Sequence, residues 1–108
     1  MDMQERLENL MNILLSVIPD VYHYTAVQKK EKYIVWAEDS GGQVHAGDNQ
    51  VTDQAIIGTI DYYTKTEFDP NVDLIARSLS NAKISYKLNS IQHEDETGYI
   101  HYEWLFEV

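Results

Sequence analysis

Residues 93–108, HEDETGYIHYEWLFEV, decide the fold because they combine a turn with a strongly alternating strand. Gly98 adopts positive φ at little cost, so residues 94–98 predict the loop of a β-hairpin with an acidic tip. One parity of the following strand is apolar and aromatic: Ile100, Tyr102, Trp104, Phe106 and Val108. The other parity carries Tyr99, His101, Glu103, Leu105 and Glu107. This alternation predicts a strand whose even-numbered side chains fill a core.

Earlier segments with strand character complete the predicted sheet. Residues 33–37 (YIVWA) are β-branched or apolar on both parities, which predicts a strand that is covered on both faces or lies centrally in the sheet. Residues 54–66 have the composition of a long strand. Residues 84–89 alternate between apolar and polar side chains, which predicts a half-buried strand. A short extended stretch over residues 21–24 is an optional further strand.

Two helices are predicted from their apolar stripes. The first covers residues 3–18, where apolar residues recur every three or four positions and Pro19 ends the pattern. The second begins after Asp69, a residue type that caps helices, with Pro70 at the first helical position, where its missing N–H costs nothing. Its apolar stripe continues to Ala82.

The element order is therefore α-β-β-α-β-β, and the predicted fold class is α+β, an antiparallel sheet with two helices packed on one face. The length fits a single domain over residues 1–108. Residues 38–53 are the longest irregular stretch, which predicts a functional or mobile loop that orders against a neighbouring molecule. This loop contains His45 and Asp48, two residue types that bind metals but do not by themselves define a metal site.

Eighteen acidic residues against eight basic ones give a formal net charge of −10. This balance argues against nucleic acid and anionic membranes as partners, because Lys and Arg supply most of the affinity for both. The absence of cysteine excludes disulfides, thiolate metal sites and a cysteine nucleophile. No apolar run is long enough to span a bilayer, and the acidic start is opposite to a signal peptide, so we expect synthesis in the cytoplasm.

The sequence predicts neither enzymatic activity nor a bound metal or cofactor. It lacks the G-x-S-x-G turn of serine hydrolases and a glycine-rich phosphate loop. Asp61 and Glu103 both lie mid-strand on the more polar parity, so they converge if their strands are neighbours. We expect these carboxylates to form a surface ladder that Lys65 or Lys87 neutralises.

The chain has eight tyrosines, more than a core of this size requires. Tyr62 and Tyr63 are adjacent on one strand, so one of them must point away from the helix-covered face. Exposed tyrosines are enriched in protein interfaces. We therefore predict an interface formed by the second face of the sheet and the long loop: Asp61, Tyr63, Tyr99, His101, Glu103, Leu105, His45 and Asp48.

Four segments carry a resemblance to a known family: LENLMNILLSVIPDVYHY (7–24), KYIVWAED (32–39), GTIDYYTKTEFDPNVDLIARSL (58–79) and GYIHYEWLFEV (98–108). With this order of elements the chain resembles the tail-completion and tail-terminator proteins of bacteriophages and prophages. The resemblance implies a non-enzymatic virion protein that assembles as a ring, with a hexamer suggested, at the head-proximal end of the tail. The implied partners are other copies of the chain, the tail-tube protein and the head-connector protein.

Two other hypotheses remain open at this point. An acidic inhibitor that imitates nucleic acid requires a continuous negative stripe along one face. A small-ligand-binding or enzymatic α+β module centred on Asp61 and Glu103 requires a closed pocket beside that pair.

Overall fold

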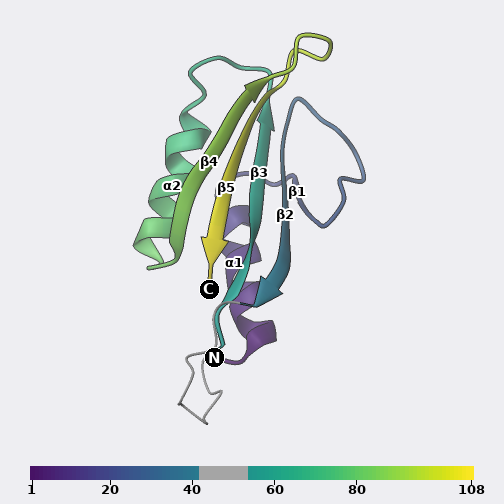
Figure 1. The fold of residues 1–108 in the computed structure, drawn as a ribbon. Helices are drawn as coiled ribbons and strands as arrows, with labels where there is room; N and C mark the ends of the chain where they lie inside the picture. Colours follow the sequence, from purple (N-terminus) through teal and green to yellow (C-terminus); the bar gives the residue numbers. More distant parts are fainter. Residues whose placement is uncertain (42–53) are drawn as a thin grey trace.

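The computed structural model describes residues 1–41 and 54–108 and confirms the α+β fold class (Figure 1). Its elements in chain order are α1 (Met3–Leu15), β1 (Val21–His23), β2 (Lys32–Gly41), β3 (Ile56–Thr64), α2 (Pro70–Asn81), β4 (Ser85–His93) and β5 (Ile100–Glu107). The optional strand is thus present as β1. Predicted loop residues 38–41 belong instead to β2, which continues past an irregular register at Glu38 and Ser40. His45 and Asp48 lie outside the described residues.

The five strands form one sheet in the order β1-β2-β3-β5-β4. The pairs β2/β3, β3/β5 and β4/β5 are antiparallel, as the sequence predicts for the two hairpin pairs. β1 runs parallel to β2, which makes the sheet mixed rather than wholly antiparallel. β1 and β4 are therefore the two edge strands, on opposite sides of the sheet (Figure 1).

Both helices pack on the same face of the sheet, which buries the even-numbered side chains of β3 and β5. The core joins residues from α1, α2 and the central strands: Leu7, Leu10, Leu14, Ile18, Ile34, Trp36, Ile56, Ile60, Tyr62, Ile75, Leu79, Trp104 and Phe106. The predicted core parity of the closing strand is confirmed, since Trp104 and Phe106 are each 2% exposed. Among the described residues, no helix is long and apolar enough to cross a membrane.

The junction between β3 and α2 is held by the buried carboxylate of Asp69. Its Oδ2 accepts hydrogen bonds from the hydroxyls of Tyr62 and Thr64, each at 2.7 Å, and its Oδ1 accepts from the backbone N–H of Asn71 at 2.9 Å. Lys32 Nζ lies 3.3 Å from Oδ2. Burial alone raises the pKa of Asp69, but these hydrogen bonds outweigh it and hold the pKa below its ordinary value.

The face of the sheet opposite the helices is partly covered by residues 24–31, which connect β1 to β2. The Tyr99 hydroxyl donates to the Lys30 carbonyl at 2.6 Å, and this tyrosine is only 7% exposed. Tyr99, which the sequence places on the partner-facing parity, is therefore buried by its own chain. The second face is not the bare surface that the sequence predicts.

Candidate functional site

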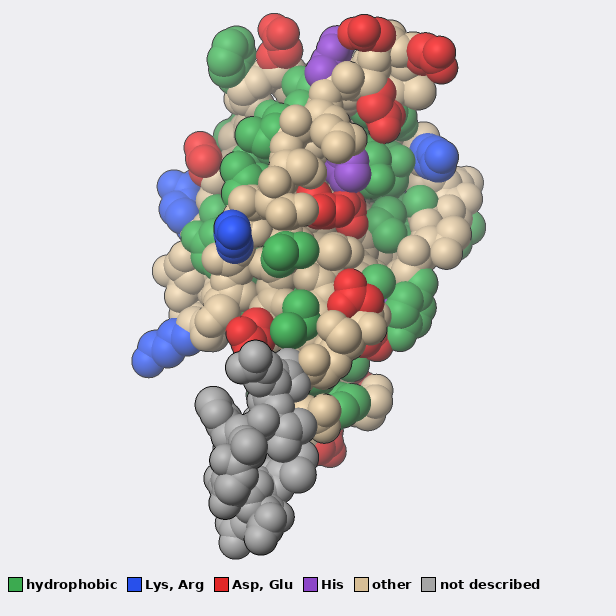
Figure 2. Space-filling model, in the orientation of Figure 1, with side chains coloured by type: hydrophobic (Ala, Val, Ile, Leu, Met, Phe, Trp, Pro, Cys, Tyr) green, Lys and Arg blue, Asp and Glu red, His purple; other side chains and the backbone are tan. Residues whose placement is uncertain are grey.

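A cluster of titratable side chains lies on that second face, where β3 and β5 pair. Asp61 lies opposite Glu103, and Tyr63 lies opposite His101. The two carboxylates therefore converge, as the sequence predicts for neighbouring strands. In the space-filling view, histidine and acidic side chains lie side by side near the middle of this face (Figure 2).

The cluster is closely packed. His101 Nε2 is hydrogen-bonded to Asp61 Oδ1 at 2.6 Å, and these two side chains are 15% and 16% exposed. One donor atom from each of Asp61, His101 and Glu103 lies within 4.8 Å of the others. We call these three residues the Asp-His-Glu cluster.

Glu103 is oriented by the edge strand next to β5. Asn89 Nδ2 donates to Glu103 Oε1 at 2.7 Å. The β4–β5 register shifts between Leu88 and Ser90, which makes Asn89 the extra residue of a β-bulge. Bulges redirect side chains in this way, and this one places an amide beside a carboxylate.

Electrostatics within the cluster are unfavourable for two ionised carboxylates. Burial raises the pKa of Asp61 above its ordinary value; the hydrogen bond and charge of His101 oppose this rise, and the Glu103 carboxylate adds to it. The prediction that Lys65 or Lys87 neutralises Asp61 and Glu103 is wrong. Lys65 Nζ lies 4.9 Å from the centre of the Tyr99 ring, and Lys87 makes no ion pair in the part of the chain described. Asp61 instead pairs with His101.

A row of aromatic rings leads to the cluster. Tyr33 stacks on Tyr63 with ring centres 4.7 Å apart, and Tyr63 stacks on His101 at 4.3 Å. Tyr99 meets Tyr33 and Tyr63 edge-on. Burial raises the pKa of Tyr33 to about 12, so its hydroxyl stays protonated at neutral pH. Tyr63 is half-buried and forms the middle of this row.

An open groove of about 430 Å³ runs beside these rings. Its lining comes from the sheet face, from the 24–31 connection and from the hairpin loop, and it includes Lys29, Asp61, Tyr63 and Glu94. The groove is partly open to solvent, whereas the ligand-binding hypothesis requires a closed pocket. Leu105, the remaining predicted interface residue of β5, lies outside it and lines a separate depression of about 260 Å³ beside Lys87 and Glu107.

Sequence reasoning missed a second histidine–carboxylate pair near the β1 edge. His23 Nε2 lies 2.6 Å from Glu38 Oε1, and the Tyr24 hydroxyl donates to Glu38 Oε2 at 2.6 Å. The pair depends on the parallel register of β1 on β2, which places His23 opposite Trp36. A three-residue strand offers no periodicity from which this register follows. Sequence reasoning also missed Asn89 and Tyr33. Tyr33 has the same parity as Val35 and Ala37 on β2, and this alternation was the signal that could have identified its face of the sheet.

Comparisons with known proteins give a distant structural likeness. No family model and no curated protein sequence matches the chain. A crystal structure from Akkermansia muciniphila is similar with a TM-score of 0.43 and 12% sequence identity, over 95% of this chain and 49% of that one. The chain thus spans about half the length of that protein.

Proposed function

We propose that the protein is a non-enzymatic structural subunit of a phage or prophage virion, a tail-terminator or tail-completion protein that assembles as a ring at the head-proximal end of the tail. The four sequence segments that resemble this family support the proposal. One structural observation carries it: large apolar side chains are exposed at both opposite edges of the sheet.

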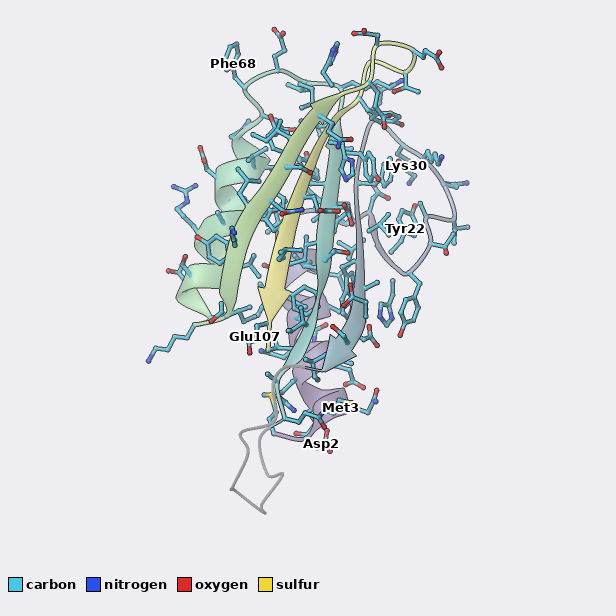
Figure 3. All side chains as sticks on the ribbon, in the orientation of Figure 1. Asp2, Met3, Tyr22, Lys30, Phe68 and Glu107 are labelled. Atoms are coloured by element: carbon cyan, nitrogen blue, oxygen red, sulfur yellow. The ribbon has the colours of Figure 1, made fainter. Side chains whose placement is uncertain are left out.

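The first exposed group lies at the β4 edge. Leu88 is 45% exposed and Ile91 is 57% exposed, both on this edge strand. Phe68, in the β3–α2 connection, is 96% exposed and has a φ of 56°, a backbone conformation that is strained for a bulky residue. Figure 3 shows Phe68 at the end of the sheet away from the two termini. A strained aromatic side chain that is almost fully exposed is typical of a binding anchor.

The second exposed group lies beside the opposite edge. Tyr24 and Val27, which follow β1, are 58% and 84% exposed. Figure 3 shows Tyr22 and Lys30 of the same region on the side of β2 away from β4. The two apolar groups thus face different directions and cannot contact each other within one chain.

Two different apolar groups on opposite sides favour head-to-tail association. Such a heterologous contact repeats from subunit to subunit and closes into a ring when the rotation per step allows it. The net charge of −10 keeps free subunits apart until specific contacts form. A hexameric ring, with the tail-tube and head-connector proteins on its two sides, is the assembly that the family resemblance implies.

Multi-angle light scattering tests this proposal, with the full chain at rising concentration and with the tail-tube protein from the same phage or prophage. We expect a mass that rises from the 12.5 kDa of one chain to a defined multiple, or a stable complex with the tube protein. A strict monomer under both conditions contradicts the proposal.

A further inference from the structure

We propose that Asp61, His101 and Glu103 bind a divalent transition-metal ion, with Zn²⁺ as the representative ion. This inference goes beyond the proposed function and does not depend on it. It concerns the second face of the sheet, whereas the assembly proposal rests on the two edges.

The donor set fits such an ion. An imidazole nitrogen with two carboxylate oxygens is a ligand combination that Zn²⁺ and its first-row neighbours accept, whereas Ca²⁺ and Mg²⁺ prefer oxygen ligands alone. Ligand atoms around a tetrahedral Zn²⁺ are roughly 3.4 Å apart, given metal–ligand bonds of about 2.0–2.2 Å. The three donor atoms here lie within 4.8 Å of one another, so small side-chain rotations bring them to that spacing. Three protein ligands leave one position for water.

The charge balance also favours a cation at this place. Asp61 and Glu103 are directly opposite each other on paired strands, and like charges in that position repel. Both are partly buried, and neither makes an ion pair with Lys or Arg in the part of the chain that the structure describes. A divalent ion held by both carboxylates removes this repulsion.

The surroundings hold the donors in place without the ion. Asn89 donates to one oxygen of Glu103 at 2.7 Å and leaves the other oxygen free to coordinate. The Tyr63 ring stacks on His101 with an interplanar angle of 13°, which restricts rotation of the imidazole. Outer contacts of this kind orient ligands and contribute to metal affinity. The backbone positions are fixed by β3 and β5, two of the three interior strands of the sheet.

Isothermal titration calorimetry of the EDTA-stripped full chain with ZnCl₂ tests the site. We expect one ion per chain for the wild type, and binding at least about tenfold weaker for His101→Gln and for Glu103→Gln, because loss of a direct ligand costs no less than loss of an outer contact. Asp61→Asn serves as a third variant if either of these fails to fold. Circular dichroism in EDTA identifies the folded variants.

Two control variants locate the ion. His23→Gln removes the histidine of the His23–Glu38 pair, which has no second carboxylate within ligand distance among the described residues. His45→Gln changes a histidine outside the described residues. We expect both to bind Zn²⁺ as the wild type does. The proposal is overturned if the wild-type protein does not bind Zn²⁺. It is also overturned if either control variant loses binding while folded His101→Gln binds Zn²⁺ fully.

Discussion

The carboxylate of Asp69 accepts hydrogen bonds from two buried hydroxyls and caps α2, with its side chain fully buried. The pKa of this group is lowered in the folded protein, so its contribution to stability is complete above the unfolded pKa and is lost as the pH falls through the folded value. For an aspartate the unfolded pKa is about 3.9.

We expect Asp69→Asn to lower the free energy of unfolding at pH 7 by about 2–3 kcal/mol, because it removes a charge that holds several hydrogen bonds. The difference from the wild type should narrow as the pH falls below about 4. Urea denaturation at pH 7 and in steps down to pH 3 measures both effects. Asp73→Asn, at an exposed position in the first turn of α2, is the control and should change stability little. An Asp69→Asn effect that does not vary with pH would contradict this explanation.

At Gly58, β3 lies very close to the backbone of β2. A Cβ added there would lie 2.0 Å from the Ala37 carbonyl oxygen and 2.7 Å from the Glu38 Cα, both of them backbone atoms that cannot rotate away. We expect Gly58→Ala to destabilise the fold by about 2–4 kcal/mol. Gly98→Ala is the comparison, since its Cβ meets open space and its φ of 78° accounts for a cost of about 1 kcal/mol. Thermal denaturation measures both losses of stability. If the two variants lose equal stability, the close approach of the strands at Gly58 does not determine the cost of the substitution.

The pairing of β3 with β5 brings the residues of the Asp-His-Glu cluster together. It also places the carboxylates of Asp61 and Glu103 opposite each other, which is unfavourable. Glu103→Gln removes the repulsion with Asp61 and keeps an oxygen that accepts from Asn89. We expect this variant, in EDTA, to be more stable than the wild type by about 0.5 kcal/mol. Guanidinium denaturation in EDTA measures the change. A clear loss of stability would mean that the Glu103 charge is favourable without a metal ion.

Element by element, the sequence predicts the fold where periodicity is long enough to read. The alternation of β5 and the stripes of the helices gave the core face, which the structure confirms. The extent of β4 was underestimated because the bulge at Asn89 shifts the parity, so that Ile91 follows Leu88 by three positions rather than two. The parallel pairing of β1 was not predictable, because three residues carry no register.

The sequence also predicts part of the candidate site, because strand alternation shows which side chains share a face of the sheet. Asp61 and Glu103 share a parity on adjacent strands, and this placed them together correctly. The burial of Tyr99 depends on a contact with Lys30 in the β1–β2 connection, about seventy residues away in sequence, and no local pattern indicates it. The interface role predicted for these residues stays a prediction.

In the whole molecule, exposed apolar residues lie at both edges of the sheet and the titratable cluster lies on its second face. The assembly proposal requires that the two edges bind each other in neighbouring subunits. Ile91 on β4 represents one edge, and Val27, which follows β1, represents the other. Ile91→Thr removes apolar surface from an exposed position of the edge strand and keeps a β-branched side chain, so this variant should fold.

The central claim is tested most directly by mixing two variants, Ile91→Thr and Val27→Ser, and measuring mass by sedimentation velocity. Each variant retains one intact edge, so each alone should be monomeric where the wild type assembles. Their equimolar mixture should form a dimer that does not grow, since a single intact head-to-tail interface remains. A mixture that stays monomeric at concentrations where the wild type forms rings would contradict head-to-tail assembly through these two edges.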